Sequence, residues 1–150
     1  MISADLILPD LRATSKKQAF RSMAEAVAPL VGSTAEAVFD ALMARERIGT
    51  TGIGGGVAIP HVKLEGLENI FGVLARLDSP VDYDAIDGGP VDLIFMMLVP
   101  AESKTTQHLK VLAQISRFLK DCDTCETLRG CTERKKIEDL IAEWTRSQAA

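Results

Sequence analysis

Hydrophobic residues in the first third of the chain recur every three or four positions, which is the spacing of one face of an α-helix. The first of these stripes, which includes Leu30, begins after a capping box opened by Ser15 and ends at Gly32. A second stripe begins after a capping box opened by Ser33 and ends at Ile48–Gly49. The pattern predicts two consecutive helices, and the apolar segment DLILP before them predicts a short extended stretch.

The middle of the chain changes to apolar runs bounded by glycine, proline and aspartate, which are typical of β-strands. Two such runs cover residues 69–77 and 91–99, and the second is apolar almost throughout, so we expect it at the centre of a sheet. The segment between them predicts a loop with a short extended piece. Helical spacing then returns in two stripes, one from His108 to Leu119 that Ser103 can cap, and one after Thr132.

The order of these elements, β-α-α-β-β-α-α, predicts an α/β fold, with a single domain over residues 1–150 and a mixed β-sheet flanked by helices on both sides. Composition agrees, because 150 residues with 47% hydrophobic and 25% charged residues suit one globular core. The formal net charge of −4 argues against a nucleic-acid partner, which would favour a basic surface.

Neither membrane insertion nor export is expected. The longest apolar run, LIFMMLVPA, is too short to cross a bilayer. The N-terminal sequence MISADLILPD has no basic segment before its apolar residues, as a signal peptide would have. We therefore expect a cytoplasmic protein.

Three cysteines lie close together late in the chain, at Cys122, Cys125 and Cys131. A zinc site built on them would lack a nearby fourth ligand, and the C-x-x-C pair follows a helical pattern where a redox motif would open a helix after a strand. We expect reduced, structural cysteines and no metal, with metal or redox chemistry as the minor alternative.

The stretch TTGIGGGVAIPHVK, residues 50–63, concentrates the candidate chemistry. Its glycines, Gly52, Gly54, Gly55 and Gly56, permit positive φ and close backbone approach, so their N–H groups can form a concave site for a phosphate. No Gly-Lys-Ser/Thr follows them, and neither the strand nor the helix of a dinucleotide fingerprint flanks them. We therefore predict phosphate binding by this backbone without a nucleotide cofactor.

Two histidines are candidates for chemistry. His61 follows Pro60, which stiffens the backbone on its approach, and a neutral imidazole near pH 7 can act as a nucleophile. His108 stands at the start of a predicted helix, where free N–H groups favour a phosphoryl group. Alternatively, the first is a loop histidine with no chemical role and the second is satisfied by a carbonyl or water.

One arginine lies close to these candidates. Arg45 shares the packed stripe of the second helix near its C-terminus, where it can cap carbonyls or direct its guanidinium at phosphate oxygens. Arg47 and Lys63 are nearby alternatives for the same role. Glu46 is expected on a solvated face.

The segment RERIGTTGIGGGVAIPH resembles the active-site signature of the IIA components of the bacterial phosphoenolpyruvate-dependent phosphotransferase system, of the fructose/mannitol type. The segments SKKQAF, PVDYDAIDGGPVDLIFMMLVP and HLKVLAQISRFLKD are similar to the nitrogen-regulatory branch of that family, so the resemblance covers nearly the whole chain. One departure is ESKTTQ before His108, where that branch is usually short and rich in glycine and alanine.

The resemblance implies a phosphotransferase component with a regulatory role in nitrogen, potassium or carbon metabolism. His61 would accept a phosphoryl group from the phosphohistidine of a small carrier protein, and Arg45 and His108 occupy the positions of the family's supporting arginine and second histidine. Downstream regulatory proteins such as kinases or transporters would recognise the phosphorylation state. An apolar collar would surround the phosphoryl group; its members are Ile53, Val57 and Ile59.

Two alternatives stay open beside this interpretation. The chain can be a sugar-specific IIA donor that passes its phosphoryl group to a IIB component. It can also be a binding module for an anion or a protein that is never phosphorylated.

Overall fold

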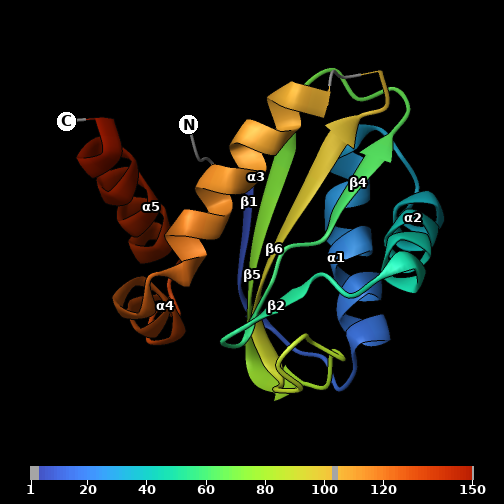
Figure 1. Ribbon diagram of the computed structural model, residues 1–150. Helices are drawn as coiled ribbons and strands as arrows, with labels where there is room; N and C mark the ends of the chain where they lie inside the picture. Colours follow the sequence, from blue (N-terminus) through green and yellow to red (C-terminus); the bar gives the residue numbers. More distant parts are fainter. Residues whose placement is uncertain (1–3, 103–104, 150) are drawn as a thin grey trace.

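The computed structural model describes residues 4–102 and 105–149, and within these ranges a mixed sheet lies between two layers of helices (Figure 1). In chain order the described elements are β1 (Leu6–Leu11), α1 (Lys16–Val31), α2 (Ala35–Ile48), β2 (Gly52–Gly54), β3 (Val57–Ala58), β4 (His61–Leu64), β5 (Phe71–Val81), β6 (Val91–Pro100), α3 (Thr105–Lys120), α4 (Cys122–Arg129) and α5 (Arg134–Ala149).

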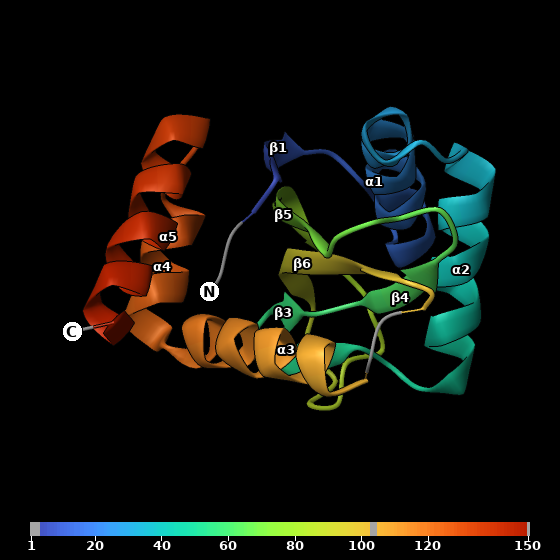
Figure 2. The same ribbon diagram turned by 90° about the horizontal axis from the view of Figure 1, so that it is seen from above.

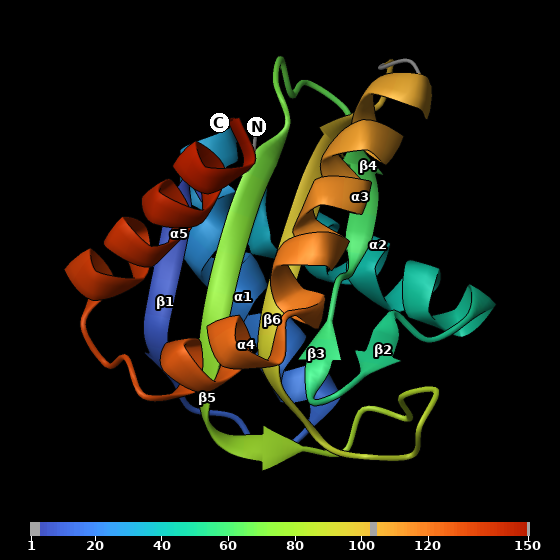
Figure 3. The same ribbon diagram turned by 60° about the vertical axis from the view of Figure 1, so that its left-hand side comes forward.

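The sheet contains both parallel and antiparallel neighbours. Its strand order is β1-β5-β6-β3-β2, and β4 also pairs with β6. The pairs β1/β5, β3/β6 and β4/β6 are parallel, whereas β5/β6 and β2/β3 are antiparallel. Helices α1 and α2 cover one face, and α3 crosses the other face, on which α4 and α5 also pack (Figures 2 and 3). The predicted α/β fold with a mixed sheet between helices is therefore confirmed.

Strand β6 lies at the centre of this sheet and is buried on both faces, as the apolar run predicted. Its side chains alternate between two hydrophobic clusters, because successive residues of a strand point to opposite faces. Ile94 and Met96 belong to the cluster formed with α1 and α2. Phe95 and Met97 belong to the cluster formed with α3, α4 and α5.

Two details predicted for helices α1 and α2 were wrong. The side chain that caps α2 is Thr34 and not Ser33, because Thr34 accepts from the N–H of Ala37. Leu30 is 56% exposed and lies outside the buried stripe of α1. Ser103, the expected cap of the third helix, lies outside the described residues.

The glycine-rich segment was predicted as a loop, but it forms three short strands. Strands β2 and β3 form an antiparallel hairpin, and β4 follows directly after Pro60. Three glycines in the hairpin, Gly54, Gly55 and Gly56, have positive φ. Strand propensity is low for glycine, so the sequence pattern concealed this hairpin.

Helix α4 was also missing from the predicted order. It begins at Cys122 behind Asp121, whose carboxylate accepts from the N–H groups of residues 123 and 124. All three cysteines are free, and the Cys125 thiol is buried and donates to the carbonyl oxygen of Leu119 over 2.9 Å. Burial raises the pKa of the Cys125 thiol. The burial of the Cys125 thiol and its hydrogen bond therefore indicate a structural role for this residue.

The described residues contain neither a cluster of metal-ligating side chains nor a helix that could span a membrane. Among them, no group of three or more histidine, cysteine, aspartate or glutamate side chains could hold a metal ion. None of the helices in the described part of the chain has the length and apolarity needed to cross a membrane.

Candidate functional site

A pocket of about 380 Å³ opens where the end of α2, strand β4 and the start of α3 meet. Arg45 and Ile48 line it from α2, His61 and Lys63 from β4, and His108 from α3. The structure thus brings together the three side chains that the sequence singled out, although they come from three separate elements.

The pairing of β4 with β6 directs His61 toward the α3 face of the sheet. His61 is opposite Met97 and Lys63 is opposite Val99, both of which pack against α3. Paired residues of neighbouring strands share a face of the sheet, so the His61 side chain faces α3. The intervening Val62 instead packs into the cluster formed with α1 and α2.

The imidazole of His61 is held by a hydrogen bond within its own chain segment. Its Nδ1 lies 3.2 Å from the carbonyl oxygen of Ile59. A carbonyl oxygen only accepts, so Nδ1 carries the proton and Nε2 of the neutral ring keeps its lone pair. Burial lowers the pKa of His61, and the electrostatic effects of Arg45 and His108 lower it further, against the opposing effect of the Ile59 carbonyl. The ring is therefore neutral near pH 7.

The Arg45 guanidinium caps α2 and lines the pocket at the same time. Its Nη1 donates to the carbonyl oxygen of Gly49 over 2.9 Å, so the capping interpretation is correct. A guanidinium has five N–H donors, and one bond to Gly49 leaves capacity for an anion in the pocket. Of the two alternatives considered, Lys63 also lines this pocket, whereas Arg47 lines a separate groove beside Lys16.

His108 stands in the first turn of α3 and is 9% exposed. Its Nδ1 is the buried side-chain nitrogen that has no hydrogen-bond partner among the described residues. The expectation of a histidine satisfied by a carbonyl therefore does not hold at Nδ1. Most buried polar atoms in folded proteins are paired, so an unpaired imidazole nitrogen beside a pocket makes His108 a candidate ligand-binding residue.

The four glycines do not line this pocket. They lie in the β2–β3 hairpin, where the Gly55 N–H donates to the Asp87 carboxylate over 3.1 Å. The N–H groups of Gly55 and Gly89 lower the pKa of Asp87, with that of Gly89 having the larger effect. The anion at this glycine turn is therefore a side chain of the protein itself.

Close packing accounts for two of the glycines. A Cβ on Gly52 would lie 2.8 Å from the Cβ of Ala85. A Cβ on Gly56, where φ is +82°, would collide with the guanidinium of Arg129. That guanidinium donates to Asp92 and to the carbonyl oxygen of Gly55, and so fastens the hairpin to α4.

The predicted apolar collar does not form at this pocket, because Ile53, Val57 and Ile59 are all absent from its lining and Ile53 lines a separate groove beside Arg129. Val57 and Ile59 are 1% and 3% exposed and belong to the core beneath α3. The exposed apolar side chains near the pocket are instead Ile48, which lines it, and Leu109, which follows His108. Strand pairing of the glycine-rich segment turned Val57 and Ile59 inward.

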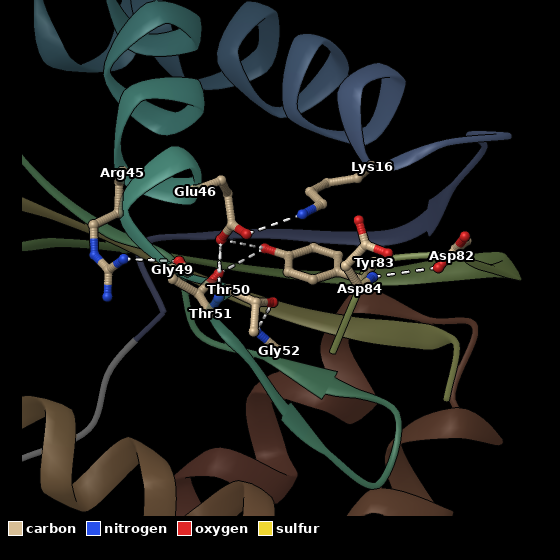
Figure 4. Close-up of polar contacts among 10 residues, drawn as sticks. All are labelled: Lys16, Arg45, Glu46, Gly49, Thr50, Thr51, Gly52, Asp82, Tyr83 and Asp84. Carbon is tan, nitrogen blue, oxygen red and sulfur yellow. Dashed lines mark hydrogen bonds and ion pairs between the residues drawn. The ribbon is translucent and has the colours of Figure 1, made fainter. Parts of the chain in front are cut away.

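Glu46 was expected on a solvated face, and this was wrong. Its side chain is 4% exposed and forms an ion pair with Lys16 of α1 at 3.0 Å. The same carboxylate accepts from the hydroxyl groups of Thr51 and Tyr83 and from the N–H of Thr51 (Figure 4). Sequence reasoning missed this cluster because Lys16 and Tyr83 are distant in the chain and neither belongs to a periodic motif.

Comparisons with known proteins show the family to which the chain belongs. The family model described as "Phosphoenolpyruvate-dependent sugar phosphotransferase system, EIIA 2" matches residues 1–144. The nitrogen regulatory protein of Bradyrhizobium diazoefficiens is 46% identical over 142 residues, covering 95% of this chain and 92% of that protein. The fructose-specific EIIA component of Haloferax volcanii is 38% identical over 108 residues, covering 72% and 70% of the two chains.

A solved structure is similar to this chain in both fold and sequence, and it supports the same family. The crystal structure of nitrogen regulatory protein IIA-Ntr from Neisseria meningitidis matches with a TM-score of 0.83 and 35% identity, covering 90% of this chain and 91% of that one. The resemblance seen in the sequence to the nitrogen-regulatory branch is thereby confirmed. The chain belongs to the EIIA type 2 family of the phosphoenolpyruvate-dependent sugar phosphotransferase system.

Proposed function

We propose that this chain is a regulatory phosphocarrier that accepts a phosphoryl group on Nε2 of His61 from the phosphohistidine of a small carrier protein. The observation that carries the proposal is the hydrogen bond from Nδ1 of His61 to Ile59, because it leaves Nε2 of a neutral ring as the nucleophile. Family membership supports a role in phosphoryl transfer.

The transfer step needs positioning and charge stabilisation and no metal ligand set. The lone pair of His61 Nε2 attacks phosphorus, the bond from phosphorus to the carrier's imidazole breaks, and that imidazole leaves with the electron pair. Arg45 and His108 line the same pocket and would stabilise the charge on the equatorial oxygens. His108 Nδ1 or its second ring nitrogen supplies an N–H donor for this purpose.

The glycine backbone has a smaller part in this proposal than the sequence suggested. Gly52, Gly54, Gly55 and Gly56 would shape the hairpin that leads to His61, while the phosphoryl oxygens are met by side chains. This division follows from the Gly55–Asp87 hydrogen bond and from the position of the hairpin outside the pocket.

Phosphorylation would act as a signal through charge. It places approximately two negative charges in a pocket lined by Arg45, Lys63 and the exposed apolar Ile48. A partner that binds the unmodified surface through its positive and apolar groups would lose affinity, and one that needs an anion would gain it. Downstream regulatory proteins in the cytoplasm, such as kinases or transporters, are the partners we expect. The 46% identity to a nitrogen regulatory protein favours this role.

A decisive experiment incubates the purified chain with phosphoenolpyruvate, the general kinase of the system and the small carrier, followed by mass spectrometry under alkaline conditions. We expect one acid-labile phosphoryl group, its absence in His61→Ala, and its absence when the carrier is omitted. An unmodified wild-type chain would instead support a binding module that is never phosphorylated.

A sugar-specific donor is the second candidate, because a fructose-specific EIIA component is 38% identical. Adding a fructose-type IIB domain to the phosphorylated chain separates the two roles. Rapid loss of the phosphoryl group to IIB would favour sugar uptake, whereas its retention would favour regulation.

A further inference from the structure

The carboxylate of Glu46 is buried at the centre of four polar contacts. Lys16 Nζ lies 3.0 Å from Oε2, and Oε1 accepts from the backbone N–H of Thr51 at 3.1 Å, from the Thr51 hydroxyl and from the Tyr83 hydroxyl at 3.3 Å. Burial raises the pKa of Tyr83, and the negative charge of Glu46 raises it further, against the opposing effect of the contact with Thr51. The phenol therefore keeps its proton and can donate it. Such a cluster is stable only when its buried polar atoms are paired, and here both oxygens of the Glu46 carboxylate have partners.

A continuous path of hydrogen bonds leads from this carboxylate to the ring of His61. Glu46 binds both the N–H and the hydroxyl of Thr51. The carbonyl oxygen of Thr51 accepts the N–H of Ile59 over 3.0 Å. The carbonyl oxygen of Ile59 in turn accepts from Nδ1 of His61 over 3.2 Å. The carbonyl oxygen that fixes the His61 tautomer thus belongs to Ile59, which is bonded to Thr51. Thr51 is in turn bonded to Glu46.

A second, shorter path leads from the same turn to Arg45. The segment that leaves α2 is clamped by two adjacent side chains, since Arg45 binds the carbonyl oxygen of Gly49 and Glu46 binds Thr51 (Figure 4). Any release of Thr51 frees the Gly49 carbonyl to move, and with it the guanidinium that lines the pocket.

We propose that Glu46 is a positioning residue with two effects. Through Thr51 and Ile59 it holds His61 in the tautomer that leaves Nε2 free. Through the turn that follows α2 it keeps the Arg45 guanidinium at the pocket. The inference rests on the proposed function for its kinetic consequence. Its structural consequence, the tautomer of His61, does not depend on phosphorylation.

The test replaces Glu46 by glutamine, which keeps the shape of the side chain and removes the charge that Lys16 requires. We expect the maximal rate of phosphoryl transfer to fall about 10- to 100-fold, as for a small displacement of reacting groups, while the KM for the carrier stays within twofold. Nitrogen-15 NMR of the unphosphorylated chain should show His61 changing from one Nδ1–H tautomer to a mixture.

Two further variants keep the proposal testable if Glu46→Gln does not fold. Thr51→Val removes one donor to the carboxylate, and Tyr83→Phe removes another while leaving the ring. We expect both to give smaller losses in the same direction, with the larger change in Thr51→Val because Thr51 lies on the path to His61. Glu46→Asp, which restores the charge at a shorter reach, should recover part of the rate.

A matched control is available on the same pair of helices. Glu36 of α2 forms an exposed ion pair with Arg21 of α1, so Glu36→Gln also breaks a bond between α1 and α2 without touching Thr51. We expect wild-type kinetics and a wild-type His61 spectrum from Glu36→Gln. A folded Glu46→Gln variant with an unchanged His61 tautomer would overturn the proposal, even if wild-type phosphorylation itself were absent.

Discussion

His61 and His108 line one pocket with opposite hydrogen-bonding states at Nδ1. The Nδ1 of His61 is bonded to the carbonyl oxygen of Ile59, whereas that of His108 is buried with no partner among the described residues. The first arrangement fixes the tautomer in which Nε2 of His61 is free, as the proposed nucleophile requires. The second keeps a polar nitrogen available, at an energetic cost that binding of an oxyanion would recover.

The acceptor form of His61 should persist below the pH at which an exposed histidine becomes protonated. Because burial lowers the pKa of His61, the neutral ring is lost only as the pH falls through a value below the ordinary 6.5. The transfer rate from a pre-phosphorylated carrier should therefore be flat from about pH 8 to about pH 6.5 and decline below it. An NMR titration of His61 checks this without the carrier, and a midpoint at or above 6.5 would contradict it.

Replacing His108 by alanine should change catalysis much more than stability. The loss of an N–H donor to the transferring group should lower the transfer rate by about 100-fold or more. The free energy of unfolding should change by less than about 1 kcal/mol, because relief of an unpaired buried nitrogen offsets lost packing. Quench-flow kinetics and thermal unfolding measure the two effects. Gln107→Ala, on the exposed side of the same turn, is the control and should change neither.

The replacement of Arg45 by methionine separates its capping role from its role in the pocket. The cap to Gly49 is a single, exposed hydrogen bond, so its loss should cost about 1 kcal/mol or less. The transfer rate should fall about 100-fold, and the pKa of His61 should rise because the positive charge of Arg45 lowers it in the wild type. Arg47 lies in the same turn but lines a separate groove, so Arg47→Met should leave the transfer rate and the pKa of His61 unchanged. A wild-type transfer rate in Arg45→Met would show that this residue is only a cap.

The elements that the sequence predicted well are those in which one periodic pattern dominates. The central position of β6 followed from its continuous apolar run, and helix α1 followed from its stripe and its Ser15 cap. Helix α4 was missed because it has eight residues and few apolar positions, so its periodicity is weak. Strands β2 and β3 were missed because glycine lacks the side chains that reveal a strand, and because β2 depends on pairing with β3, which in turn pairs with β6.

The candidate site was predictable to the extent that its chemistry lies in short motifs. His61, Arg45 and His108 were found from residue type, position on an element and the resemblance, and the pocket brings them together. The sequence did not reveal which nitrogen of His61 is free, because that depends on a backbone carbonyl two residues earlier. It also did not reveal the contacts of Glu46, whose partners come from α1, from the loop after β5 and from the residue before β2.

Glycine substitutions will decide whether the hairpin shapes the site or binds phosphate. Gly56→Ala introduces a side chain at φ +82° and against the Arg129 guanidinium, so the free energy of unfolding should fall by about 2–5 kcal/mol. Gly52→Ala, which is crowded by Ala85 but has no positive φ, should cost about 1–3 kcal/mol. Chemical denaturation measures both losses.

The control for these substitutions is Gly49→Ala, because this glycine has extended backbone and open space around its Cβ position. It should change neither stability nor transfer. If the hairpin glycines only maintain structure, the folded fraction of Gly56→Ala at low temperature should transfer phosphoryl groups at close to the wild-type rate, since its backbone N–H is kept and lies outside the pocket. A stable Gly56→Ala variant with a transfer rate reduced about 100-fold, the effect of a small displacement near the reacting groups, would instead indicate that the geometry of the glycine backbone contributes to phosphate binding.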